Sequence, residues 1–321
     1  MMTTKIFQRV LAIFLVVAAI FLANGVAKAD AYDDIQKYTA QIAQNPNDAG
    51  AYIGRANTYF LLGQYYEAIQ DYSKAIQINP NYYNAYYGRG IAYRSLGQYE
   101  RAIQEHNKAI QINPNYYKAY HGRGVAYSYL GQYERAIQDF NKTIQLNPNY
   151  ESAYNNRGWA YLDMKQYERA IQDYNKVIQL NPNNDNAYYN RGWSYHNLGQ
   201  YKRAIQDYDK AIQLNPNYAQ AYFGRGASYY DLGQYEQAIQ DYSKAIQINP
   251  SYACVYNNRG KVYADLGQYE LAIQDYSKSI ELKDPHLAEV YNNRGRAYEK
   301  LGNITSAQAD FAKAKQLGYK G

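Results

Sequence analysis

The chain of 321 residues contains few of the residues that form disulfides or bind metals. It has one cysteine, Cys254, so no internal disulfide can form and the fold must be stabilised by packing. Its four histidines do not belong to any cluster of His, Cys, Asp and Glu with the spacing of metal ligands; they are His106, His121, His196 and His286. No nucleophile is matched with a base and oxyanion donors. We therefore expect no metal, no cofactor and no enzymatic activity.

A strong charge of one sign is also missing. The sequence has 34 Lys and Arg against 28 Asp and Glu, and three of the basic residues precede Asp30, which leaves a net charge of +3 from that residue onward. This balance is too weak to attract nucleic acid or an anionic membrane surface. We expect no nucleic-acid partner.

The chain has one long apolar run, and it is short for a membrane span. Lys5 and Arg9 precede thirteen apolar residues over 10–22, whereas a relaxed span needs about 20. Small residues at 27 and 29 follow, so residues 1–29 are predicted to be a signal peptide that is cleaved between Ala29 and Asp30. We expect an exported protein, periplasmic or secreted. The alternative is an uncleaved N-terminal anchor, which would be the protein's only membrane contact.

Proline is scarce, but its positions are regular. Seven of the eight prolines are spaced 34 residues apart, and Pro285 follows 35 residues after the seventh; the seven are Pro46, Pro80, Pro114, Pro148, Pro182, Pro216 and Pro250. A fixed period of 34 residues is typical of stacked helical hairpins, none of which can bury its apolar face alone. The period therefore predicts an array of repeats.

We number the positions of each repeat as slots 1–34, with the proline in slot 32. The repeats then cover 49–82, 83–116, 117–150, 151–184, 185–218, 219–252, 253–287 and 288–321. Residues 30–48 precede them as half a repeat. Within it, Ile35, Tyr38 and Ile42 recur at helical spacing, so a helix over 33–45 is predicted to cap the array.

Two signals end helices in the repeats, a residue at slot 15 and an Asn-Pro pair that the first six repeats carry. Slot 15 is glycine in seven repeats and Lys165 in the fourth, and glycine readily takes the left-handed conformation that follows a helix. The Asn-Pro pair in slots 31 and 32 ends the second helix, because proline cannot continue it and restrains the residue before. Each repeat is thus predicted to be a pair of helices.

The repeats resemble the tetratricopeptide repeat family. The sixth repeat carries the aromatic, Gly, Tyr, Ala, aromatic, Pro signature at the family's offsets, as Tyr222, Gly226, Tyr229, Ala238, Tyr242 and Pro250. The resemblance covers about 270 residues and implies an all-α, right-handed superhelical solenoid of antiparallel helix pairs, with eight repeats and an N-terminal half-repeat. It also implies a concave groove that holds a peptide or a partner domain.

Slot 7, usually Leu in the family, is arginine in every repeat here, and slot 23 is always acidic. A half-buried arginine needs a carboxylate to accept its fork of donors, so we predict a ladder of ion pairs between first and second helices. The arginines are Arg55, Arg89, Arg123, Arg157, Arg191, Arg225, Arg259 and Arg294. Their partners are Asp71, Glu105, Asp139, Asp173, Asp207, Asp241, Asp275 and Asp310.

Two other conspicuous patterns are interpreted as packing. Gly88-Arg89-Gly90 and Gly122-Arg123-Gly124 look like RNA-binding Arg-Gly motifs, but they fall inside a helix, where small residues allow close approach. The 43 tyrosines recur mostly in slots 4, 11, 17, 24 and 34, which predicts that they fill the core and the contacts between repeats.

A site that recognises an aperiodic partner can be encoded only at positions that differ between the repeats. Slots 2, 5, 9, 12 and 13 vary and are predicted to point into the groove; the alternative is that these exposed slots drift freely. Exposed aromatic residues often anchor partners, and the candidates are Trp159, Tyr189, Trp193, Phe223 and Tyr230. Asparagines in slots 5 and 6 could hold an extended peptide backbone; they are Asn155, Asn156, Asn190, Asn257, Asn258, Asn292 and Asn293. Lys261 and Arg296 suggest an acidic segment or carboxylate.

We therefore expect an exported, non-catalytic scaffold that binds a partner protein or an extended peptide in its concave groove. The alternative is a factor for assembly of the cell envelope or a membrane complex, which acts through its convex face and repeat edges. Self-association through the C-terminal repeat is a further possibility, because the sequence ends at Gly321 without an additional polar capping helix.

Overall fold

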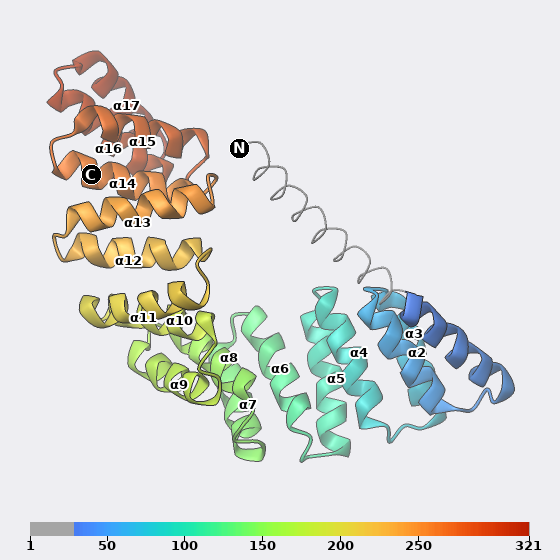
Figure 1. Ribbon diagram of the computed structural model, residues 1–321. Helices are drawn as coiled ribbons and strands as arrows, with labels where there is room; N and C mark the ends of the chain where they lie inside the picture. The colour runs from blue at the N-terminus through green and yellow to red at the C-terminus, as the bar shows by residue number, and fades with distance from the viewer. Residues whose placement is uncertain (1–28, 321) are drawn as a thin grey trace, which may run out of the picture. The chain divides into compact units, whose positions relative to one another are not determined.

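The computed structural model describes residues 29–320 (Figure 1). The predicted signal peptide lies outside the described residues except for Ala29, and its cleavage before Asp30 stays a prediction. The chain divides into two compact units, one ending at Ala153 and the other beginning at Tyr154. Each unit is described by itself.

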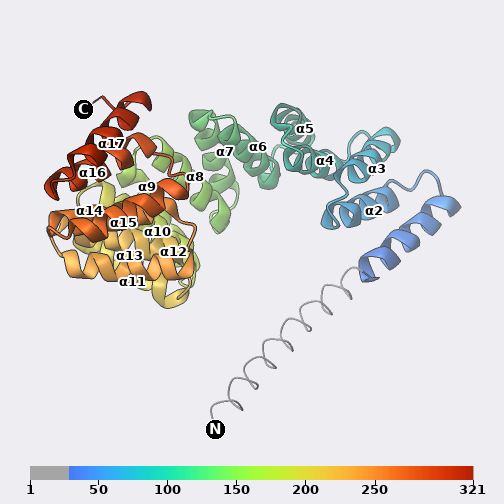
Figure 2. The same cartoon turned by 90° about the horizontal axis from the view of Figure 1, so that it is seen from above.

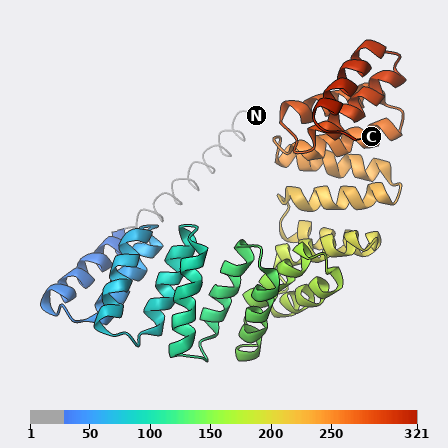
Figure 3. The same ribbon diagram turned by 180° about the vertical axis from the view of Figure 1, so that it is seen from behind.

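The first unit contains six complete helices that follow one another as three antiparallel pairs (Figures 1 and 3). A helix over residues 29–44 precedes them. The six helices are α2 (Ala49–Leu61), α3 (Tyr65–Ile78), α4 (Tyr83–Ser95), α5 (Tyr99–Ile112), α6 (Tyr117–Tyr129) and α7 (Tyr133–Leu146).

The boundary between the units falls inside α8 (Glu151–Asp163), and the second unit continues with nine further helices (Figure 2). These are α9 (Tyr167–Leu180), α10 (Asp185–Asn197), α11 (Tyr201–Leu214), α12 (Ala219–Asp231), α13 (Tyr235–Ile248), α14 (Ala253–Asp265), α15 (Tyr269–Glu281), α16 (Leu287–Lys300) and α17 (Ile304–Gln316). No strand occurs in residues 29–320, so the predicted all-α solenoid of helix pairs is confirmed.

Helices contact their sequence neighbours, and the first helices of successive repeats also contact one another. In the first unit α2 contacts α4 and α4 contacts α6; in the second unit α10, α12, α14 and α16 form the same series. Direct contact between every other helix places the first helices along the inner side of each stack. The slots that vary on these helices are therefore the ones that can face a groove.

The turns use the chemistry that the sequence predicts. Glycine at slot 15 has a φ between 69° and 76°, the left-handed region in which other residues are strained. The next N–H bonds back to the helix, as Gln64 does to the carbonyl of Tyr59 at 2.9 Å. At the other end, the side chain of Asn79 accepts a hydrogen bond from the backbone N–H of Asn81 at 2.9 Å and closes a turn around Pro80.

Small residues and aromatic rings form the core. Slot 20 is a buried alanine in every repeat, and the slot 24 ring beside it is buried in most, as Tyr72, Tyr174 and Tyr208 are. The glycines beside the slot 7 arginine make room for these rings: a Cβ on Gly88 would lie 2.5 Å from the ring of Tyr72. The interpretation of the Gly-Arg-Gly motifs as packing elements is confirmed.

The predicted ladder of ion pairs is present in all eight repeats. Each slot 7 arginine meets its slot 23 carboxylate with a shortest N–O distance between 2.6 and 2.8 Å, and each does so through two nitrogens. The third donor often reaches slot 25 of the preceding repeat, as Arg89 reaches the hydroxyl of Ser73 at 2.9 Å and Arg191 reaches the amide oxygen of Asn175 at 2.6 Å. One side chain thus joins three helices.

Candidate functional site

The varying slots of the first helices line a pocket in each unit. In the first unit a cavity of about 510 Å³ is built from slots 2, 5, 6, 9 and 12 of α2 and α4, together with two tyrosine rings from slots 24 and 34. Its lining residues are Ile53, Asn57, Phe60, Tyr72, Asn84, Tyr87, Gly88, Ile91, Arg94 and Tyr116.

The second unit has a smaller pocket of about 260 Å³ near its C-terminal end. It lies among α12, α14, α15 and α16, and its lining residues are Tyr230, Lys261, Ala264, Asp265, Tyr269, Tyr276, Asn293, Arg296, Ala297 and Lys300. Four of the predicted site residues, Tyr230, Lys261, Asn293 and Arg296, are thus brought together. They come from three successive repeats.

The two tryptophans lie on first helices of the second unit, Trp159 on α8 and Trp193 on α10. Trp159 has 46% of its surface exposed and is one of the larger exposed rings in the chain. Trp193 is half-buried and stacks on His196, with 5.8 Å between ring centroids and 19° between planes. That both indoles face a partner stays a prediction, and Trp159 is the more exposed of the two.

Both ring nitrogens of His196 have polar neighbours. Nδ1 lies 3.0 Å from the hydroxyl of Ser228, whose oxygen also lies 3.0 Å from the carbonyl of Gly224. Nε2 lies 3.6 Å from the carboxylate of Asp231. Burial lowers the pKa of His196, and Asp231 partly offsets this effect. The imidazole beside Trp193 is therefore neutral at pH 7.

The slot 5 aromatics serve mainly as packing groups. Tyr189 packs on Tyr208 and Tyr218, with centroids 5.9 and 5.1 Å away, and Phe223 packs in the same way at slots 24 and 34 of its own repeat. Both rings are half-buried. Tyr230 is different, because its hydroxyl donates to Asp265 at 2.8 Å on the pocket surface.

The same geometry corrects the prediction for two asparagines. Asn257 and Asn292 are only 4% and 7% exposed, so neither presents an amide to a groove. Both occupy slot 5, which faces the rings of its own repeat, and Asn292 donates to the hydroxyl of Tyr319 at 3.1 Å. Sequence reasoning placed slot 5 too far toward the open side of the helix.

The other predicted asparagines are half-buried. Asn258 donates its side-chain N–H to the carbonyl of Cys254 at 2.8 Å, which is a bond inside its own helix. Asn293 reaches Asn257 at 3.5 Å, and the side-chain oxygen of Asn155 is buried without a hydrogen-bond partner. Asn156 on α8 and Asn190 on α10 stay predicted groove residues.

The predicted basic end of the surface is only partly available. Lys261 forms an ion pair with Glu289, with 2.6 Å between Nζ and the carboxylate, so its charge is already balanced. Arg296 is exposed and shares the pocket with Lys300 and Asp265. The cationic character here rests on Arg296 and Lys300 rather than on the predicted pair.

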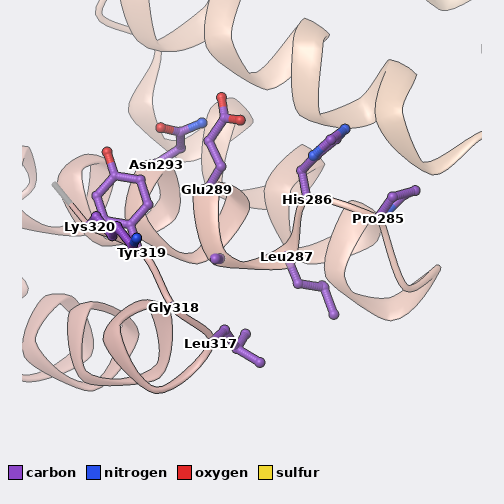
Figure 4. Close-up of a pocket in the computed structure, with 10 residues that line it drawn as sticks. Pro285, His286, Leu287, Glu289, Asn293, Leu317, Gly318, Tyr319 and Lys320 are labelled. Atoms are coloured by element: carbon purple, nitrogen blue, oxygen red, sulfur yellow. The ribbon is translucent and has the colours of Figure 1, made fainter.

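A third pocket, of about 700 Å³, lies at the C-terminal end of the second unit (Figure 4). One side is the turn that contains Pro285 and His286, and the other is the segment from Leu317 to Lys320. The turn is fixed by Asp284, which is 2% exposed, bonds to the hydroxyl of Ser279 at 3.0 Å and accepts the N–H of His286 at 2.7 Å. Self-association through this repeat stays a prediction.

No group of three or more His, Cys, Asp or Glu in residues 29–320 is placed to hold a metal ion. No helix there is long and apolar enough to cross a membrane.

Family sequence profiles match nearly the whole array. Profiles described as tetratricopeptide repeat match residues 49–82, 117–150, 152–184 and 186–218, then 72–104 and 207–240, and finally 288–317. A profile described as TPR repeat matches 90–129, 226–267 and 260–302. The chain belongs to the tetratricopeptide repeat family. The resemblance that the proline register and the sixth repeat indicated is confirmed.

Solved structures share the tetratricopeptide fold. A tetratricopeptide repeat protein from Parabacteroides merdae is 20% identical, with a TM-score of 0.59 over 81% of this chain and 98% of its own. The Cut9-Hcn1 complex of the APC/C matches 83% of this chain and 52% of its own at 17% identity and a TM-score of 0.60. MamA from Desulfovibrio magneticus matches 53% and 96% at 24% identity and 0.51. No curated protein sequence matches the chain.

Proposed function

We propose that the protein is an exported, non-catalytic scaffold that binds a partner protein or an extended peptide along the inner side of its second unit. The single observation that carries this proposal is the exposed ring of Trp159, next along the inner surface to the Trp193–His196 stack. An exposed indole is costly to hydrate and gains free energy when a partner covers it. Membership of a family of interaction scaffolds supports the same conclusion.

The chemistry of this surface favours an extended segment over a small ligand. Trp159 and Trp193 occupy equivalent slots one repeat apart, and the Tyr230–Arg296 pocket is formed by the three repeats that follow. A chain that lies across successive first helices meets an aromatic region first and a mixed, partly cationic pocket afterwards. We therefore expect a partner segment with an apolar part and an acidic part.

The second part of the proposal is that the protein is exported. It rests on Lys5, Arg9, the apolar run over 10–22 and the small residues before Asp30. N-terminal sequencing of the protein isolated from its host checks this directly, since cleavage yields a chain that begins at Asp30. A chain that begins at residue 1 or 2 and pellets with membranes supports the anchored alternative.

The binding proposal is tested by crosslinking the full-length protein in its native envelope and identifying the crosslinked proteins. We expect Trp159→Ala combined with Trp193→Ala to abolish the crosslinks while the helical circular dichroism is unchanged. The matched control removes an equally exposed aromatic from a second helix, Tyr66→Ala, whose ring is 66% exposed. Loss of crosslinks in the control but not in the tryptophan variant would support action through the convex face and would refute the proposed surface.

A further inference from the structure

Arg94 differs from the arginines of the ladder. It occupies slot 12 in the last turn of α4 and lines the 510 Å³ pocket of the first unit. All eight slot 7 arginines hold a carboxylate, whereas Arg94 has no ion-pair partner among the residues that the structure describes. Its side chain is half-buried on the wall of the pocket.

The rest of the pocket contains no negative charge. Its walls are Ile53, Phe60 and Ile91 with the tyrosine rings, and no Asp or Glu is among the lining residues. Slots 2, 5, 9, 12 and 13 of the first three repeats carry no acidic residue either, but they include Lys118. By contrast, slot 13 of the second unit supplies Asp163, Asp231 and Asp265. An occupant of the first pocket therefore meets positive charge alone.

Two amides and the guanidinium supply hydrogen-bond donors to the pocket. The hydroxyl of Tyr72 donates to the side-chain oxygen of Asn57 at 2.6 Å, which leaves the N–H groups of that amide for the pocket. Asn84 adds a second, exposed amide on the opposite helix. Together with the five N–H groups of the guanidinium, they surround a site suited to an acceptor with several lone pairs.

The histidines near Arg94 add no second positive charge. Burial, followed by the nearby charge of Arg94, lowers the pKa of His106 to about 3 and that of His121 to about 4. Both imidazoles are neutral at pH 7. The guanidinium is thus the one permanent positive charge among the residues lining the pocket.

We infer that this pocket binds an acidic residue of an extended peptide, with the carboxylate on Arg94, Asn57 and Asn84. A large apolar residue next to it in the peptide lies against Phe60, Ile91 and Tyr87. A planar carboxylate pairs with the guanidinium fork through two bonds, and the apolar walls exclude water from that pair. The inference does not depend on the proposed tryptophan surface, because the two sites lie in separate units and share no residue.

Binding of the purified chain to an array of short peptides tests this. Each peptide is about eight residues long with a central Glu beside Phe, Leu, Ile, Tyr or Trp, and each has a twin with Gln in place of Glu. We expect the wild-type chain to bind the best Glu peptide about tenfold or more tightly than its Gln twin, with the preference weakening as salt is added. Equal binding of both twins refutes the inference.

Variants locate the site. Arg94→Gln is expected to lose the preference for Glu over Gln, whereas Arg94→Lys keeps part of it, because lysine supplies a point charge without the fork. The control is Arg101→Gln, an exposed arginine of α5 that bonds to Gln98 and lies over the ring of Tyr93. Because Arg94→Lys should keep part of the preference, it shows whether the loss in Arg94→Gln comes from recognition or from a folding defect. A preference that survives in both variants overturns the assignment to this pocket.

The double substitution Trp159→Ala with Trp193→Ala is included to separate the two sites. We expect it to leave the preference for Glu peptides unchanged, since the residues of the first unit are intact. If acetate or inorganic phosphate competes as effectively as the best peptide, the apolar walls contribute nothing and the acidic-peptide assignment is wrong.

Discussion

At the scale of single residues, tyrosine explains how this chain packs with so few aliphatic side chains. Its ring fills space between helices while its hydroxyl bonds at the surface, as Tyr218 does with Asn186 at 2.7 Å. Where the ring is buried completely the hydroxyl can lose its partner, and those of Tyr174 and Tyr208 have none. The rings take the place of an aliphatic core, so a change at slot 24 affects the contact with the next repeat as well.

His106 is the polar exception at slot 24. It is completely buried, neither ring nitrogen has a hydrogen-bond partner, and its ring lies against Gly90, Gly122 and Tyr87. Burial, followed by the charges of Arg94, Arg123 and His121, lowers its pKa to about 3. In the unfolded chain the imidazole has its ordinary pKa of about 6.5. Below that value the unfolded chain binds a proton that the native chain excludes.

We therefore predict that the free energy of unfolding falls as pH drops from about 6.5 toward 3, by up to about 1.4 kcal/mol per unit for this group. His106→Phe should remove this component and gain about 2 kcal/mol at about pH 5 relative to wild type, with a smaller effect at about pH 7.5. Phe140 fills the same slot one repeat later, so the ring is compatible with the site. Urea unfolding of the variant and the wild type at both pH values measures this difference in the free energy of unfolding.

The surface histidine provides the control. His286 is exposed in the turn before α16, and His286→Gln should leave the free energy of unfolding close to that of wild type. His121, whose pKa burial lowers to about 4, contributes a second component of the same sign, so His106→Phe reduces the slope without abolishing it. An unchanged slope in His106→Phe means that the ring is reached by water.

At the scale of helices and turns, the fourth repeat deviates from the rule that the others obey. Lys165 occupies slot 15 with a φ of 56°, where the other repeats have glycine. Its N–H bonds to the carbonyl of Leu162 at 2.8 Å and that of Gln166 to Tyr161, so the turn keeps its shape. The left-handed conformation costs a residue with a Cβ roughly 1–2 kcal/mol. The repeat folds because the adjacent packing outweighs this strain.

Lys165→Gly is accordingly predicted to stabilise the chain by about 1 kcal/mol, since glycine adopts this φ without strain. The gain is reduced by the extra freedom that glycine gives the unfolded chain. The reciprocal change, Gly199→Lys in the next repeat, should destabilise by a similar amount. Thermal or urea unfolding of the two variants measures both. A loss of stability in Lys165→Gly contradicts the strain argument.

The elements also show where sequence reasoning reaches its limit. The helix ends, the Gly-Arg-Gly motifs and the Arg–acid pairs follow from rules that repeat every 34 residues, so the sequence predicts them. The burial of Asn257 does not follow from such rules, because a helical wheel cannot show that slot 5 faces the rings of slots 24 and 34. Nor can it show that Lys261 is balanced by Glu289, one repeat later, at 2.6 Å.

The Arg94 pocket was missed for a related reason. Its signal was in the sequence, as the one basic residue at slot 12 among otherwise apolar or neutral neighbours in the first two repeats. The two tryptophans drew the site prediction to the second unit instead. Side-chain identity could suggest where partners bind, but only the three-dimensional arrangement distinguishes a paired cation from an unpaired one.

At the scale of the whole molecule, the ladder of ion pairs connects neighbouring repeats. Arg191 bonds to both carboxylate oxygens of Asp207 in its own repeat and to Asn175 in the preceding one, at 2.6–2.7 Å. Its guanidinium also lies 5.6 Å from the ring centre of Tyr188. In a repeat array, stability is approximately a sum of repeat and interface terms, so a group that belongs to both terms affects cooperativity.

We predict that Asp207→Ala destabilises the array by about 2–5 kcal/mol, because it leaves the charge of Arg191 without a partner at a site where Asp207 is only 5% exposed. Since Arg191 touches the preceding repeat, amide hydrogen exchange should speed up in α9, α10 and α11 but not in α3 to α5. Glu236→Ala, at an exposed acid in the first turn of α13, is the control and should change little. Replacing both partners, with Arg191→Met and Asp207→Leu, should recover much of the loss, because no buried charge remains. If the single variant unfolds at the wild-type urea concentration, or if the double variant is no better than the single, the ladder does not hold the repeats together.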